Sequence, residues 1–306
     1  IMKVLKEWCI NAPWGKVAFM SWGNPKGEPV LLVHGRQDSL VTFEPLLKLV
    51  PDSYYYVAFD LPGHGKSDGF PKGDKIRVTY VLAVKVAVDH LDWQQFIYIG
   101  HSMASELGLF YNVLHPNRIK KMVLLDPGPS FQFLVAYEPR RNFKDLCASY
   151  YDNYKFFTKD DRVYTKESAI KAVMRNRSMT RDQAELLLSR NLIKVGEDKY
   201  KLTWERRLKV LYPLQNTLEY QKELLIKNLP PVFIVACTQS HSKFSYRDTW
   251  AESLKLLEYM SQQRNCTMIT VEGDHDLHFK NPELFIQDLR NSGVEGGVKI
   301  RFSNRP

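Results

Sequence analysis

A serine lies between an apolar run at 96–99 and a helical pattern, within Gly100-His101-Ser102-Met103-Ala104. A serine on a sharp strand-to-helix turn holds its hydroxyl above the edge of a sheet, where it serves as a nucleophile. The usual motif for this turn is G-x-S-x-G, and Ala104 replaces its second glycine with one added methyl group. We interpret the stretch as a variant of that turn, and a serine that only caps the helix is the alternative.

A histidine follows the last apolar run of the chain. His275 comes shortly after a strand predicted at 267–271. A serine hydroxyl needs a base within hydrogen-bond reach, and loops at the carboxyl ends of parallel strands gather functional groups. We therefore expect His275 to be the base, and His278 to pack or hydrogen-bond within the same loop.

A carboxylate must hold the imidazole in its useful tautomer. The strand predicted at 120–125 ends at Asp126, whereas the next strand along the chain has no acid after it before Asp248. We predict Asp126 as the orienting acid, and a loop-forming Asp-Pro at a strand end is the alternative. Asp274 and Asp276 flank the histidine, but side chains adjacent in sequence point apart.

Acyl-transfer chemistry also needs donors for the developing oxyanion, and two backbone N–H groups commonly supply them. We expect these donors to be Met103, next to the serine, and Arg36, after the buried strand at 29–33. A glycine before Arg36 lets that loop bend close to the serine. The expected substrate contacts are Gly35, His101, Phe131 and Tyr137.

The elements around these residues predict an α/β fold, with a mostly parallel central sheet and helices on both faces. Strands are expected near 5–10, 15–22, 29–33, 54–59, 96–99, 120–125, 230–236 and 267–271, and helices near 43–50, 76–92, 103–114, 246–262 and 282–290. The first two strands form an antiparallel hairpin at one edge. The strand signal stops between 131 and 228, which predicts an inserted helical cap. The expected domains are a core at 1–130 and 229–292, the cap at 131–228 and a tail at 293–306.

Composition narrows the class of protein. The net charge is +9, and residues 131–230 hold 20 Lys and Arg against 13 Asp and Glu. We interpret this as a solvated basic surface rather than a membrane-binding one, and no nucleic-acid motif is present. Four cysteines fit neither a disulfide framework nor a zinc site. No leader pattern opens the chain. These features favour a cytoplasmic protein, and a leader before Ile1 is the open alternative.

Together these segments resemble the α/β-hydrolase superfamily, and within it the animal serine-hydrolase-like proteins of the kraken type. The resemblance rests on APWGKVAFMSWG, PVLLVHG, YYVAFDLPGHGKSD, IYIGHSMAS, MVLLDPGP and GDHDLHFKNPE. It implies a nucleophile at Ser102, a base at His275, a helical cap over the pocket, and no cofactor or metal. The chain departs from the family where Ala104-Ser105 replaces Gly-Gly and where Arg36 replaces an aromatic or small residue.

Two hypotheses follow for function. The first is a serine hydrolase that cleaves a carboxylic ester or thioester through an acyl-enzyme on Ser102, with a small-molecule acyl substrate. The second is a catalytically silent carrier or receptor for a small apolar or anionic ligand, which Arg36 and Ala104 favour. Cap aromatics are expected to form an apolar pocket wall, with ordinary core packing as the alternative: Phe131, Phe133, Tyr137, Tyr150, Tyr151, Tyr154, Phe156 and Phe157.

Overall fold

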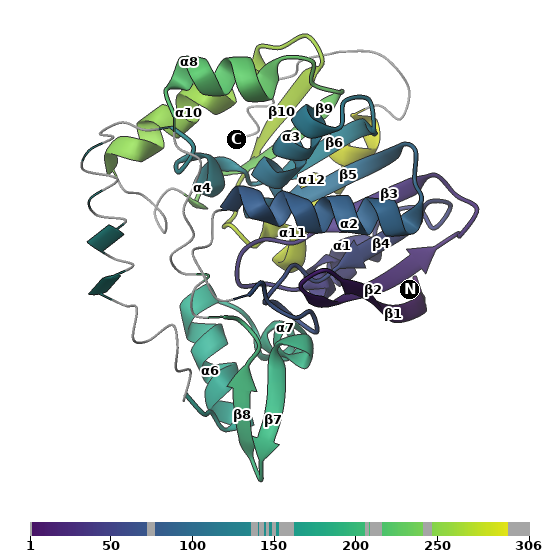
Figure 1. Cartoon of the computed structure of the whole chain (residues 1–306), viewed down its shortest axis with the longest axis vertical. Helices are drawn as coiled ribbons and strands as arrows, with labels where there is room; N and C mark the ends of the chain where they lie inside the picture. Colours follow the sequence, from purple (N-terminus) through teal and green to yellow (C-terminus); the bar gives the residue numbers. More distant parts are fainter. Residues whose placement is uncertain are drawn as a thin grey trace.

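An eight-stranded sheet forms the centre of the molecule (Figure 1). The computed structural model describes residues 2–71, 77–135, 140, 144, 147–148, 151–152, 162–205, 208, 216–240 and 247–292. The sheet order is β1-β2-β4-β3-β5-β6-β9-β10. Its strands are β1 (Val4–Ala12), β2 (Gly15–Gly23), β3 (Pro29–Val33), β4 (Tyr55–Phe59), β5 (Phe96–His101), β6 (Ile119–Leu125), β9 (Val232–Cys237) and β10 (Cys266–Val271).

The predicted fold class is confirmed. In the order β4-β3-β5-β6-β9-β10 all neighbours pair in parallel. β2 pairs antiparallel with β4, and β1 pairs with β2 as the expected antiparallel hairpin at the edge. Helices cover the central strands on both faces. A strand buried on both faces has a nearly continuous apolar sequence, which is why short apolar runs predict these strands. β3, for example, is the run PVLLV, with its last four residues buried.

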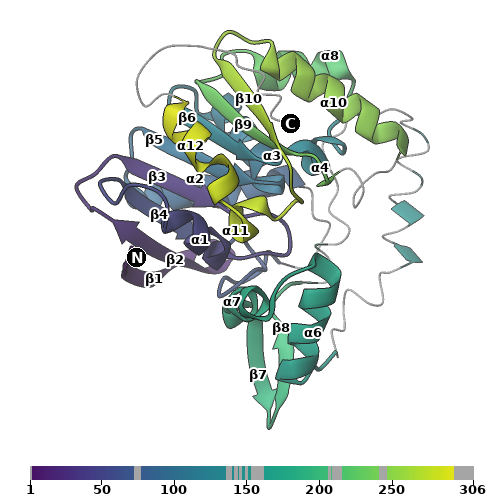
Figure 2. The same ribbon diagram turned by 180° about the vertical axis from the view of Figure 1, so that it is seen from behind.

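Helices cover the two faces of the sheet and enclose two separate apolar cores (Figures 1 and 2). One face carries η2 (Arg77–Tyr80), α2 (Val81–Leu91), α3 (Met103–Leu114), α4 (Gly128–Phe131), α8 (Leu218–Gln221), the π-helical turn η4 (Lys222–Ile226) and α10 (Arg247–Ser261). The other face carries η1 (Leu40–Phe43), α1 (Glu44–Leu47), α11 (Leu277–Lys280) and α12 (Glu283–Asn291). No helix in the described parts of the chain combines the length and the apolarity needed to cross a membrane.

The segment between β6 and β9 contains α6 (Lys166–Arg177), α7 (Arg181–Asn191), β7 (Leu192–Gly196) and β8 (Lys199–Leu202), which lie together below the sheet in both views (Figures 1 and 2). The expectation of no strand here is wrong, because β7 and β8 pair as an antiparallel hairpin. The hairpin turns at Asp198, whose φ is 44°. Lysines alternate with apolar residues along β8, and β7 is LIKVG with four of its five residues exposed. Short, poorly buried strands of this kind lack the apolar run that marks a core strand.

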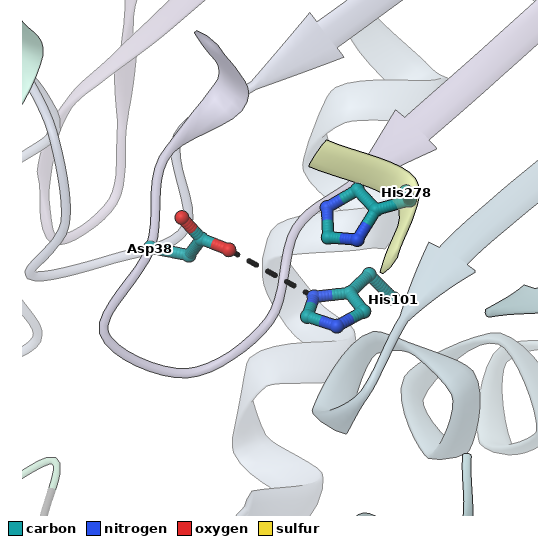
Figure 3. Close-up of side chains that lie close together, drawn as sticks. All are labelled: Asp38, His101 and His278. Atoms are coloured by element: carbon teal, nitrogen blue, oxygen red, sulfur yellow. Dashed lines mark ion pairs between the residues drawn. The ribbon is translucent and has the colours of Figure 1, made fainter. Parts of the chain in front are cut away.

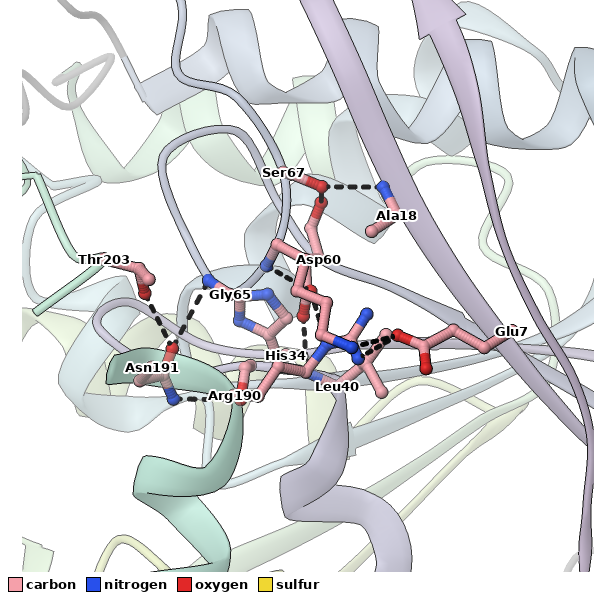
Figure 4. Close-up of polar contacts among 12 residues, drawn as sticks. Glu7, Ala18, His34, Leu40, Asp60, Gly65, Ser67, Arg190, Asn191 and Thr203 are labelled. Atoms are coloured by element: carbon pink, nitrogen blue, oxygen red, sulfur yellow. Dashed lines mark hydrogen bonds and ion pairs between the residues drawn. The ribbon is translucent and has the colours of Figure 1, made fainter. Parts of the chain in front are cut away.

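A buried ion pair attaches α7 to the ends of the core strands (Figure 4). Arg190 is 3% exposed in its side chain, and its Nε donates to Asp60 Oδ2 at 2.6 Å. A second guanidinium nitrogen of Arg190 donates to Glu7 on β1 at 2.5 Å. The next residue, Asn191, donates from its side-chain amide to Ser39 Oγ at 3.0 Å. These contacts connect α7 to three separate segments of the core.

Replacing Arg190 with glutamine is expected to lower the free energy of unfolding by about 3 kcal/mol, because the Asp60 carboxylate is then left buried without its cation. Urea unfolding followed by circular dichroism measures the change. Arg181→Gln is the control, since Arg181 on the same helix forms ion pairs with Glu167 and Glu185 that are exposed. Equal stability of the two variants would contradict the prediction.

Candidate active site

Ser102 occupies the turn between β5 and α3. Its backbone has φ 53° and ψ −118°, a conformation that costs a non-glycine residue free energy and is found mainly at functional sites. The Ser102 N–H donates to the Leu125 carbonyl at 2.9 Å, and the side chain makes no capping hydrogen bond to α3. A Cβ added at Gly100 would lie 2.8 Å from the Ala104 carbonyl oxygen, so the turn requires glycine at 100. Ala104 itself is fully buried at the start of α3.

The structure brings Ser102, His275 and Asp126 together from three different strand ends. Ser102 Oγ lies 2.8 Å from His275 Nε2, and His275 Nδ1 lies 2.5 Å from Asp126 Oδ2. In the tautomer that fits both contacts, Ser102 donates to Nε2 and Nδ1–H donates to the carboxylate. Asp126 also accepts from the Cys237 N–H at 3.0 Å and from the Ser240 hydroxyl. These donors fix the carboxylate so that it faces the imidazole.

The two acids that flank His275 point to other partners. Asp274 accepts from Lys280 Nζ at 2.5 Å. Asp276 forms a two-point ion pair with Arg177, at the end of α6. Burial opposes the charge on Asp276, but the Arg177 guanidinium outweighs it and holds the pKa of that carboxyl well below its ordinary value. Nothing in the sequence marks Arg177 as a partner of this loop.

The loop after β3 packs directly against the serine turn. A Cβ added at Gly35 would lie 3.0 Å from Ser102 Cβ and 2.9 Å from His101 Nδ1. Met103 is the first residue of α3, so its N–H lies outside the hydrogen-bond ladder of the helix. Both predicted oxyanion donors, Met103 and Arg36, line one cavity together with Ser102.

That cavity has a volume of about 430 Å³ and lies between the sheet edge and α6. Apolar side chains from both sides line it, among them Phe133, Val173 and Trp204. Its cationic side chains are Arg36, Arg77, Arg162 and Arg177. Arg77 forms a buried ion pair with Glu106 at 2.8 Å, and burial raises the pKa of Glu106 despite this neighbour.

The predicted substrate contacts fall in different places. His101 is buried, and its Nε2–H donates to the His275 carbonyl at 2.9 Å. Phe131 is fully buried in the core beneath α4, whereas Phe133, two residues later, lines the cavity. Tyr151 is 72% exposed. The remaining expected wall residues lie outside the described residues: Tyr137, Tyr150, Tyr154, Phe156 and Phe157.

A second polar cluster, which the sequence did not indicate, lies behind the serine turn and consists of Asp38, His101 and His278 (Figure 3). Asp38 Oδ2 lies 3.8 Å from His101 Nδ1, and the rings of His101 and His278 lie with centroids 4.0 Å apart and planes tilted by 34°. Burial raises the pKa of Asp38 to about 7 and lowers that of His278 to about 3. His278 packs as expected, here also against Phe43. The position of Asp38 after a core strand is the one signal that could have suggested it.

The sequence of this chain matches a known protein family. The family described as alpha/beta hydrolase fold matches residues 28–282. The chain belongs to the alpha/beta hydrolase fold family. A serine hydrolase-like protein of Danio rerio is 29% identical over 92% of this chain and 86% of its own length. Serine hydrolase-like protein 2 of Homo sapiens is 25% identical, over 92% of this chain and 91% of its own length. These matches indicate a hydrolase similar to the animal serine-hydrolase-like proteins.

Two solved structures have a similar fold. A hypothetical protein of Pseudomonas aeruginosa PAO1 superimposes with a TM-score of 0.75 at 25% identity, over 94% of this chain and all of that one. A thioesterase domain from the curacin biosynthetic pathway gives a TM-score of 0.71 at 19% identity, over 95% and 99% of the two chains. The second likeness concerns the fold alone.

Proposed function

We propose that this alpha/beta hydrolase cleaves a carboxylic ester or thioester through an acyl-enzyme on Ser102. His275 is the general base and Asp126 the acid that orients it. The observation that carries the proposal is the continuous hydrogen-bond chain from Ser102 Oγ through His275 to Asp126, with distances of 2.8 and 2.5 Å. A hydroxyl, an imidazole and a carboxylate in that order are the groups that activate a serine.

In the proposed reaction Ser102 Oγ attacks the acyl carbon while its proton passes to His275 Nε2. Asp126 stabilises the imidazolium that forms, and the N–H groups of Met103 and Arg36 stabilise the oxyanion. Collapse of the tetrahedral intermediate breaks the bond to the alcohol or thiol, which takes the proton from His275. Water, deprotonated by the same imidazole, then hydrolyses the acyl-enzyme and releases the carboxylic acid.

The cavity supports a small acyl substrate. Its volume of about 430 Å³ lies at the small end of the usual range for ligand pockets. Phe133, Val173 and Trp204 supply apolar wall for an acyl chain. The second candidate function is ligand binding without turnover, and it is favoured by Arg36, whose large side chain lines the cavity beside the serine.

Covalent labelling with a fluorophosphonate separates the two functions. The wild-type chain should form one adduct, which peptide mass mapping locates at Ser102. Ester and thioester substrates of increasing acyl length should protect against labelling, and the best protector identifies the acyl size. A folded wild-type protein that stays unlabelled would contradict the serine chemistry and favour the carrier.

Replacing Gly35 with alanine should slow labelling about 10- to 100-fold. The new Cβ would approach Ser102 Cβ to 3.0 Å and push the loop that carries Arg36 away from the serine, and small displacements of catalytic groups cost rates of this size. Stopped-flow or gel-based labelling rates test it. Gly196→Ala, at the exposed end of β7, is the matched control. An unchanged rate in Gly35→Ala would show that this close approach is not needed.

A further inference from the structure

The Asp38, His101 and His278 cluster contains buried polar atoms that lack a partner at good hydrogen-bond geometry, although the Arg177 guanidinium and the Ser39 N–H lie beside the Asp38 carboxylate. Among the described residues, five of its atoms have no hydrogen-bond partner: both carboxylate oxygens of Asp38, Nδ1 of His101 and both ring nitrogens of His278. The three residues are only 1–2% exposed. A buried polar group without a hydrogen-bond partner destabilises the fold, so several at one place call for an occupant that bonds to them.

The orientation of His101 suits a metal ligand. Its Nε2–H donates to the His275 carbonyl at 2.9 Å, so Nδ1 carries the lone pair and faces Asp38 Oδ2 (Figure 3). Metal-binding histidines usually donate their other ring N–H to a carbonyl or carboxylate in this way. The gap of 3.8 Å between the two atoms is too long for a hydrogen bond. It exceeds by about 0.4 Å the roughly 3.4 Å that separates two ligand atoms around a tetrahedral ion.

His278 completes a set of three. One ligand atom from each residue lies within 4.8 Å of the other two. A pair at that separation must close by about 1.4 Å to reach the roughly 3.4 Å between ligand atoms around a tetrahedral ion. Among the described residues the charges beside the cluster balance, and Asp38 within it adds one carboxylate. Arg177 and Lys280 face the carboxylates of Asp38, Asp274 and Asp276, and a fourth carboxylate, Asp126, lies on the far side of His275.

We propose that Asp38, His101 and His278 bind one divalent transition-metal ion of the zinc, cobalt or nickel type. Two imidazole nitrogens with one carboxylate oxygen suit these ions, whereas calcium and magnesium prefer oxygen ligands throughout. The ion reaches the cluster from the cavity. Arg177 lines that cavity, and its Nη2 lies 3.7 Å from Asp38 Oδ2, so this guanidinium must move aside for entry.

Metal binding has a consequence for catalysis, and this step rests on the proposed serine chemistry. The His275 ring lies 4.7 Å from the ring of His101. A divalent ion on His101 Nδ1 therefore adds positive charge close to the imidazole that must itself become positive during acyl transfer. We expect the bound ion to slow turnover, and a chelator to restore it.

Titration of the chelator-treated full chain with Co²⁺ tests the site without any activity measurement. Wild type should bind one equivalent and develop the visible absorption of a cobalt–imidazole complex. Asp38→Asn and His278→Gln should each weaken binding by more than about 10-fold, since even loss of an outer hydrogen-bond partner costs 10- to 100-fold. His90→Gln removes an exposed histidine on α2 and is the control for surface binding.

A second measurement keeps the test valid if a variant fails to fold. X-ray absorption of zinc-loaded wild type should show nitrogen and oxygen ligands that include two imidazoles. Lack of saturable binding, equal affinity in wild type and both variants, or a sulfur ligand would each overturn the proposal. More than one buried water would then be needed to satisfy the five atoms. Metal binding in a chain that hydrolyses no ester would leave the site standing and remove only the serine chemistry.

Discussion

Ser102→Ala is expected to abolish fluorophosphonate labelling and to lower kcat for ester hydrolysis about 10⁴- to 10⁶-fold. The hydroxyl is the group that forms the acyl-enzyme, and the loss leaves only binding and the oxyanion donors to assist attack by water. Initial rates with an activated ester, under saturating substrate, give kcat directly.

Two comparisons sharpen this prediction. Ser105→Ala removes another hydroxyl from α3, one that donates to the Gly100 carbonyl at 3.2 Å, and should keep most of the activity. The double variant Ser102→Ala, His275→Ala should be no slower than Ser102→Ala alone, because groups that act as one unit are not additive. A further large drop in the double variant would mean that His275 acts independently of the serine.

Asp126→Asn is expected to lower kcat about 10⁴-fold with little loss of stability. An amide at 126 can keep the oxygen that accepts from the Cys237 N–H. Its NH₂ group would then donate to His275 Nδ1 and leave the proton on Nε2, the tautomer that cannot accept from Ser102.

Steady-state rates, with thermal unfolding as the check on folding, measure this effect. Asp89→Asn is the control, because Asp89 is a carboxylate on the outer side of α2 that pairs with Lys85. Activity within a few-fold of wild type in Asp126→Asn would assign the orienting role to another carboxylate. Asp276 would be the first to test, although the structure pairs it with Arg177.

The sequence by itself determined the alternation of core strands and helices and placed Ser102, Asp126 and His275 at strand ends. These features are local, since a run such as PVLLV or MVLL is apolar enough to become a buried strand wherever it lies. A parallel sheet then gathers the carboxyl ends of its strands at one edge. Residues up to 173 positions apart, such as Ser102 and His275, therefore meet without any further information.

Only the tertiary structure decided what surrounds those three side chains. Arg177 meets Asp276 across 99 positions of sequence, because the placement of α6 over the sheet edge brings them together. Phe131 and Phe133 differ in role, since Phe131 ends α4 with its side chain in the core, whereas Phe133, beyond the helix, lines the cavity. Contacts of this kind depend on how whole helices and strands pack against one another. Many side chains together set that packing, so no single stretch of sequence predicts these contacts.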